Sequence, residues 1–116
     1  MNIAIDQRAT ATVVSVDGSL DALTADTLQR AFDTEVRSGR TQLVAGCAGL
    51  EYTSSAGLRV LLATMREARH RGGDLRLAGV TDKVRRVLTM SGFTSILKCY
   101  PDVESAVASY ATAVRA

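Results

Sequence analysis

Two adjacent hydroxyl side chains, Ser54 and Ser55, stand where an apolar run gives way to an amphipathic stretch beginning at Leu58. Serine is a favoured helix N-cap, where its oxygen accepts a hydrogen bond from an otherwise unpaired backbone N–H. A helix N-terminus also favours an anion, so a phosphate carried by a serine there is tolerated. Taken alone, the pattern favours capping. The two roles are compatible, because Ser54 can cap the helix while Ser55 is modified.

A serine nucleophile would need a nearby base, and the sequence argues against one. The only histidine, His70, follows Ser55 by fifteen residues, which is about 22 Å along a straight helix at 1.5 Å per residue. Ser55 also lacks the glycine two positions earlier that a nucleophile elbow requires. We therefore predict that the protein is not an enzyme and that His70 is a solvated residue near a helix C-terminus.

Composition limits the other kinds of chemistry. Two cysteines, Cys47 and Cys99, with one histidine are too few for a zinc site or a disulfide framework. With neither a P-loop nor a GxGxxG motif, the sequence predicts no metal and no cofactor. Aromatic residues make up 4% of the chain, which is too few for the stacking platforms that bind single-stranded nucleic acid. The net charge of +2 is too small, and too evenly spread, to predict a nucleic-acid partner.

The chain shows neither a membrane span nor a targeting segment. No apolar run approaches the roughly 20 residues of a transmembrane helix, and residues 1–6 lack the basic and apolar regions of a signal peptide. We expect a cytoplasmic protein without a membrane partner. A length of 116 residues, 47% of them hydrophobic and 22% charged, predicts one folded domain over residues 1–116.

The serines must be positioned by strands that alternate with helices. Short apolar or alternating runs predict strands over 3–5, 11–16, 42–47, 75–77 and 96–99. Apolar residues at three- and four-residue spacing predict helices that include 28–36, 58–68, 84–88 and 103–114. We expect Thr24 to cap the first of these helices and Asp102 to cap the last.

This order, β-β-α-β-α-β-α-β-α, is typical of an α/β fold. We expect a four- or five-stranded mixed sheet with about four helices, mainly on one face. The helix that follows Ser55 should pack on the sheet through an apolar stripe, formed by Leu58, Leu61, Leu62 and Met65.

Four blocks of sequence carry a more specific resemblance when they are read together. They are GSLDALTA (18–25), SSAGLRVLL (54–62), RGGDLRLAGV (71–80) and VRRVLTMSGF (84–93). In this order and spacing they resemble the STAS domains of bacterial anti-sigma factor antagonists. The resemblance covers nearly the whole chain and implies the STAS fold.

The resemblance also implies a partner switch. In the family, the phosphorylated serine lies two residues before the glycine of the second block, which is Ser55 here, and the aspartate of the first block falls on Asp21. An unphosphorylated antagonist binds an anti-sigma factor that is itself a serine kinase. The kinase phosphorylates the antagonist with ATP and releases it, and a metal-dependent phosphatase of the PP2C type restores it.

The expected partner-binding residues gather on two turns and the start of one helix. Arg59 lies one turn after Ser55, on the side away from the apolar stripe. The full set is Asp21, Thr24, Ser54, Ser55, Ala56, Gly57 and Arg59.

Two positions depart from the commonest family pattern. Ser54 stands where some relatives have aspartate, which leaves Ser54 as the second candidate for phosphorylation. Gly46 stands where many members have aspartate or asparagine, and it removes a side chain that could order the loop before Ser54.

A different functional class stays open beside the partner switch. The alternative is a STAS domain that acts as a scaffold or lipid-transport accessory and is never phosphorylated. For either class we expect a monomer, and the sequence leaves open whether the output is a sigma factor or another process such as secretion.

Overall fold

The computed structural model describes the backbone of residues 2–114 and the side chains of residues 2–111, so both ends of the expected 1–116 domain lie outside it. The elements, in chain order, are β1 (Asn2–Gln7), β2 (Thr12–Leu20), α1 (Ala22–Arg37), β3 (Gln42–Gly46), β4 (Leu50–Thr53), α2 (Ser55–His70), β5 (Asp74–Ala78), α3 (Asp82–Met90), the 3-10 turn η1 (Phe93–Ser95), β6 (Cys99–Tyr100) and α4 (Val103–Val114). Within the described residues, no helix combines the length and the apolar character that crossing a membrane requires.

The strands form one mixed sheet in the order β1-β2-β3-β5-β6, with β4 paired to β2. Strand β1 runs antiparallel to β2, while the β2–β3, β3–β5, β5–β6 and β2–β4 pairs are parallel. Because the carboxyl ends of parallel strands meet at one edge of a sheet, the helices that follow β2, β4 and β5 all begin at that edge. The expected α/β fold with a mixed sheet and four helices is confirmed.

Strand β4 is an addition to the expected architecture, and it brings the sheet to six strands. The first half of the nine-residue β2 pairs with β3, and its last residues pair with β4 after a register shift between Gly18 and Ser19. Only the two end residues of β4, Leu50 and Thr53, are buried. Four residues with this pattern carry no period-two alternation, so the sequence predicts a connecting segment there.

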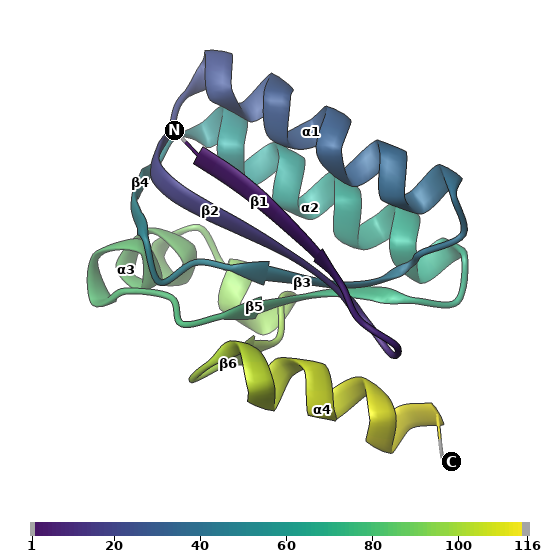
Figure 1. Ribbon diagram of the computed structural model, residues 1–116. Helices are drawn as coiled ribbons and strands as arrows, with labels where there is room; N and C mark the ends of the chain where they lie inside the picture. Colours follow the sequence, from purple (N-terminus) through teal and green to yellow (C-terminus); the bar gives the residue numbers. More distant parts are fainter. Residues whose placement is uncertain (1, 115–116) are drawn as a thin grey trace.

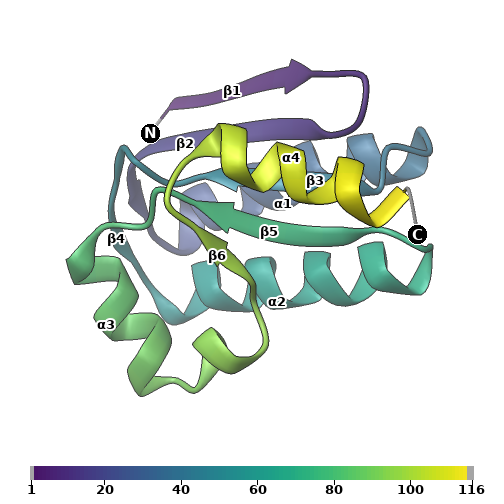
Figure 2. The same cartoon turned by 90° about the horizontal axis from the view of Figure 1, so that it is seen from below.

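The helices form two layers on the sheet. Helices α1, α2 and α3 share the main core, whereas α4 covers the opposite face over a smaller apolar cluster (Figures 1 and 2). In the expected α2 stripe, Leu58, Leu61 and Met65 are buried as predicted, while Leu62 is only half-buried. The buried face of α2 instead includes Val60, which is 6% exposed and belongs to the core.

Candidate partner-binding site at two helix N-termini

Ser54 and Ser55 lie at the junction of β4 and α2, and the backbone gives them different roles. Ser54 is the N-cap residue: its φ of −83° and ψ of 174° are extended, and its Oγ accepts a 3.3 Å hydrogen bond from the Gly57 N–H. Its carbonyl accepts the first helical bond from the Leu58 N–H at 3.1 Å. The predicted capping role of Ser54 is therefore confirmed. Ser55 is the first residue of α2, and it is exposed.

Asp21, rather than Thr24, caps α1, which corrects the expectation from the sequence. The Asp21 carboxylate accepts hydrogen bonds from the Leu23 and Thr24 N–H groups at 3.0 and 2.9 Å. In return, Thr24 Oγ1 accepts the Asp21 N–H at 2.8 Å, which completes a capping box. The bonds from Thr24 favour the charged carboxylate and lower the pKa of Asp21. Either residue type can cap a helix, and the helix begins one turn earlier than the apolar pattern indicates.

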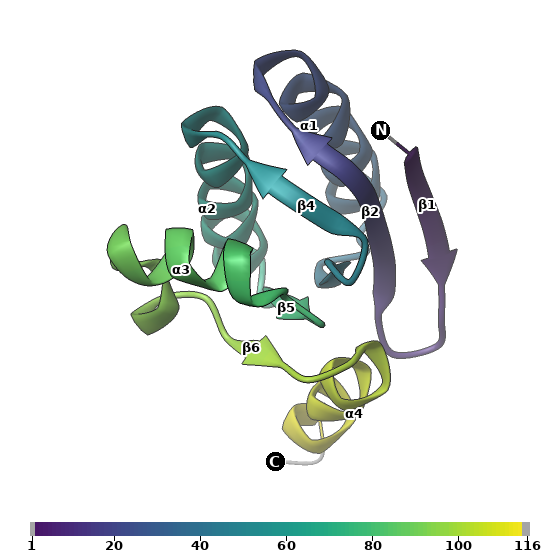
Figure 3. The same ribbon diagram turned by 90° about the vertical axis from the view of Figure 1, so that its left-hand side faces the viewer.

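The fold brings the Asp21 turn and the Ser54 turn together. Leu20 ends β2 and pairs with Thr53 at the end of the parallel strand β4. The Ser54 N–H then donates a 2.8 Å hydrogen bond to the Leu20 carbonyl, the last peptide oxygen before Asp21. Helices α1 and α2 consequently start side by side from one edge of the sheet (Figure 3).

Gly57 is what allows α2 to begin so close to the sheet. A Cβ atom at this position would lie 2.3 Å from Thr53 Oγ1 and 2.6 Å from Leu20 Cδ2. Gly57 is accordingly buried, and Ala56 beside it is half-buried against the main core. These two residues of the expected set thus position the turn, while Asp21, Ser55 and Arg59 present exposed side chains.

Arg59 brings a positive charge to this surface. Its side chain is exposed, and it makes no ion pair with any residue in the described part of the chain. Residues four apart on a helix are neighbours on its surface, so Arg59 lies on the same face of α2 as Ser55.

Two apolar side chains at this edge were missed by the sequence analysis. Leu23 in the first turn of α1 is 81% exposed, and Tyr52 on β4 is 48% exposed. Leu23 could have been found, because it falls out of phase with the buried α1 residues Leu28 and Phe32. The exposure of Tyr52 could not be predicted, because the sequence around it lacks the alternation that indicates a strand.

The segment before Ser54 is ordered without a side chain at Gly46. The Leu50 N–H donates to the Cys47 carbonyl at 3.0 Å, and the Gly18 N–H donates to the Gly49 carbonyl at 2.8 Å. A Cβ on Gly46 would come within 2.9 Å of Ser15 Oγ on the neighbouring strand. Backbone hydrogen bonds therefore hold this segment without a polar side chain at position 46.

His70 and the two cysteines are the other side chains of the chain with candidate chemistry. His70 ends α2 and so lies at the far end of the helix that Ser55 begins. Cys47 and Cys99 are free thiols, and burial raises the pKa of Cys47 to about 12. Among the residues that the structure describes, no group of three or more His, Cys, Asp or Glu side chains could hold a metal ion.

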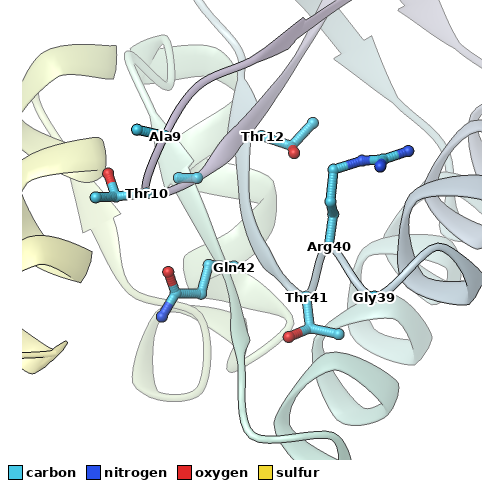
Figure 4. A pocket seen from close by; sticks show the side chains of 8 residues that line it. Ala9, Thr10, Thr12, Gly39, Arg40, Thr41 and Gln42 are labelled. Atoms are coloured by element: carbon cyan, nitrogen blue, oxygen red, sulfur yellow. The ribbon is translucent and has the colours of Figure 1, made fainter.

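A small hollow opens at the other edge of the sheet, where β1 turns into β2 and α1 into β3 (Figure 4). It measures about 230 Å³ and is lined by Arg40, Gln42 and small residues. The Arg40 guanidinium donates to Glu35 at 2.8 Å, which makes it part of a structural pair. This hollow offers no acid, base or nucleophile pair comparable to a catalytic site.

Comparisons with known proteins agree with this geometry. Residues 2–106 match the STAS domain family. BtrV of Bordetella bronchiseptica, which carries the name of an anti-sigma factor antagonist, is 31% identical over 98% of both chains. A crystal structure of an anti-sigma factor antagonist from Mycobacterium paratuberculosis superposes with a TM-score of 0.82 at 25% identity, covering 95% of this chain and 93% of that one.

A further solved structure is the Bacillus cell fate determinant SpoIIAA in its phosphorylated form. It superposes with a TM-score of 0.73 at 20% identity, over 91% of this chain and 96% of that one, and so shows the shared fold. The match of the family to most of the chain decides the assignment. The chain belongs to the STAS domain family and is similar, across nearly its whole length, to proteins named as anti-sigma factor antagonists.

Proposed function

We propose that this protein is an anti-sigma factor antagonist that works as a partner switch. Its unphosphorylated form binds an anti-sigma factor that is a serine kinase, and phosphorylation of Ser55 with ATP releases it. A PP2C-type phosphatase returns it to the binding form. In this proposal the protein is a cytoplasmic monomer and has no catalytic activity of its own.

The observation that carries the proposal is the placement of Ser55. It is exposed at the start of α2, and its neighbour Ser54 supplies the cap. The Ser55 hydroxyl is therefore not needed to hold the helix, and a kinase can modify it without removing a structural bond. The Asp21 turn beside it gives the kinase a second feature to recognise.

The free-energy balance favours a switch in binding over a change in fold. A phosphate adds a charge of roughly −1.5 to −2 at neutral pH. The helix N-terminus beneath it carries about half a positive charge, which compensates part of the added charge locally. In a closely packed complex the same dianion must be desolvated against a surface shaped for a hydroxyl. A cost of only about 3 kcal/mol weakens binding more than a hundredfold.

The chemistry of the surface indicates what the partner must present. Leu23 and Tyr52 are exposed apolar anchors, and buried aromatic and apolar anchors supply much of the energy of protein interfaces. Asp21 and Arg59 add one charge of each sign near Ser55. We therefore assign to the partner an apolar recess bordered by a cation that faces Asp21 and an anion that faces Arg59.

The test captures the partner from the native host with unphosphorylated protein and identifies it by mass spectrometry. The captured kinase is then offered ATP with the Ser55→Ala and Ser54→Ala variants. We expect phosphate on Ser54→Ala and none on Ser55→Ala. The reverse pattern would move the role to Ser54, and no phosphate on any serine, with a scaffold or transport protein captured instead, would favour the alternative class.

Binding affinity supplies the second arm of the test. Ser55→Asp should fold normally and bind the kinase at least a hundredfold more weakly than the parent. Thr34→Asp is the matched control, because Thr34 is exposed on α1 and the change adds the same charge away from the proposed contact. Equal losses for the two variants would show that net charge, rather than position 55, governs binding.

A further inference from the structure

A second surface, a basic groove, lies between the C-terminal half of α2, the helix α3 and the segment that joins η1 to β6. It measures about 510 Å³, which is within the usual range for small-molecule sites. Three of its eight lining residues are basic and none is acidic; they are Arg69, Arg85, Thr94, Ser95, Ile96, Leu97, Lys98 and Cys99.

Arg69 lines the basic groove, and two hydrogen bonds hold its side chain in place. Its Nε donates to the Asp74 carboxylate at 2.8 Å, and a terminal nitrogen donates to the Ile96 carbonyl at 2.9 Å. The same Asp74 carboxylate also accepts a 3.1 Å bond from Arg76 Nε. One carboxylate thus binds two guanidinium groups, of which Arg69 lines the groove and Arg76 lies under α4, against Ser109 and the Tyr110 ring.

Arg85 and Lys98 add two charges to the groove. Both side chains are exposed, and neither forms an ion pair with a described residue. Arg85 and Cys99 both line the groove, and the Arg85 charge opposes the rise in the pKa of the Cys99 thiol that burial causes. Thr94 and Ser95 bring hydroxyl groups to the same groove.

The positive charge is concentrated in one part of the chain, contrary to the even spread expected from the small net charge. Residues 55–100 hold nine of the fourteen Lys and Arg residues and only three of the twelve Asp and Glu residues. The basic groove is built entirely from this segment. Unpaired cations around a concave surface concentrate the field there and attract an anion.

We propose that the basic groove is a binding site for a small phosphate-bearing molecule. Guanidinium groups match phosphate oxygens with paired N–H donors, and an ammonium group adds a point charge. Arg69, Arg85 and Lys98 supply these donors from three different segments. The hydroxyl groups of Thr94 and Ser95 can bind further phosphate oxygens.

This site is independent of the proposed switch. Arg69 lies fourteen residues after Ser55 in α2, which is about 21 Å along the helix. The screening length at physiological salt is about 8 Å, so a phosphate on Ser55 has little electrostatic effect on the groove. A ligand there can bind both forms of the protein.

The test is a titration of the isolated protein with inorganic pyrophosphate, followed by amide chemical shifts in NMR and by calorimetry. We expect saturable shifts in residues 94–99. The double variant Arg85→Gln/Lys98→Gln should bind at least tenfold more weakly while keeping the melting temperature of the parent. The matched control is Lys83→Gln/Arg86→Gln, which removes the same charge at two residues of α3 that do not line the groove.

Three outcomes would overturn the assignment: shifts that do not saturate, equal weakening in the two double variants, or sulfate binding as tightly as pyrophosphate. Ser55→Asp should bind pyrophosphate within twofold of the parent. Because this readout needs no kinase, it stands even if the partner switch fails its own test.

Discussion

Ser54 and Ser55 are chemically identical neighbours, and only the helix boundary between them separates a structural role from a modifiable one. The Ser54 side chain is bound to the Gly57 N–H, whereas the Ser55 side chain lies on the exposed side of the first turn. This difference can be measured as stability, without any partner.

Removing the cap should cost stability, whereas removing the other hydroxyl should not. We expect Ser54→Ala to lower the free energy of unfolding by about 1 kcal/mol, since an N-cap bond is lost. Ser55→Ala is the matched control and should stay within about 0.5 kcal/mol of the parent. Urea denaturation measures both. Equal effects would show that Ser54 does not act as the cap.

Gly57→Ala should destabilise the protein through a steric conflict. The new methyl group would overlap Thr53 Oγ1 and the Leu20 side chain, which is 1% exposed and has no room to move. Overpacking of this kind costs roughly 1–3 kcal/mol. The melting temperature should fall well below that of Ser55→Ala. An unchanged melting temperature would mean that α2 does not sit this close to the ends of β2 and β4.

At the scale of elements, the buried aromatic residue Tyr110 joins Ala106 in packing helix α4 on the sheet. The Tyr110 hydroxyl lies 2.6 Å from the Leu43 carbonyl oxygen and 2.8 Å from the Asp74 carbonyl oxygen. The Arg76 guanidinium stacks over the ring at 4.0 Å from its centroid and also donates to Ser109. Tyr110 therefore connects α4 to β3 and β5.

Tyr110→Phe should loosen α4 while leaving the ring in place. Loss of the hydroxyl leaves buried carbonyl groups less well satisfied, at a cost of about 1–3 kcal/mol. Hydrogen exchange should speed up for amides in 103–110 more than for amides in α2. Tyr52→Phe, with its exposed side chain, is the control and should leave exchange unchanged. Uniform acceleration across the protein would indicate that α4 does not open as a separate unit.

At the scale of the whole molecule, acid should destabilise the fold through carboxylates that are bonded in the native state. Hydrogen bonds from Arg40 and Gln7 lower the pKa of Glu35, whose side chain is 3% exposed. Backbone bonds from Thr24 and Ser105 lower the pKa values of Asp21 and Asp102. A carboxyl group whose pKa is lower in the folded state than in the unfolded state stabilises the fold at pH values above its unfolded pKa. This stabilisation is lost as the pH falls toward the folded pKa.

The melting temperature should therefore fall as pH drops below about 4, where unfolded Asp and Glu begin to take up protons. Glu35→Gln should be less stable than the parent at neutral pH, because the ion pair with Arg40 is lost. This difference should shrink as pH falls through the folded pKa, since both proteins then carry a neutral side chain. Calorimetry at a series of pH values measures it. A gap that stays constant with pH would contradict the role assigned to Glu35.

The sequence by itself determined the helices, most of the strands and the residues that are candidates for the site, but it missed β4, the continuation of β2 to Leu20 and the place of β6. These features depend on neighbours within a few residues: the stripe through Leu58 and Leu61, the cap at Ser54, and the turn that contains Asp21. Local hydrogen bonding and the 3.6-residue helical period act over that range. The role expected of Ser55 came instead from the resemblance of the surrounding motif to the STAS family.

Only the tertiary structure decided which of these local features meet. The pairing of β4 with the far half of β2 places Ser54 beside Leu20, and it makes Gly57 a requirement of close packing. The basic groove likewise assembles Arg69, Arg85 and Lys98 from three segments. Contacts between distant segments follow from burial and strand pairing across the whole chain, and no local period of the sequence encodes them.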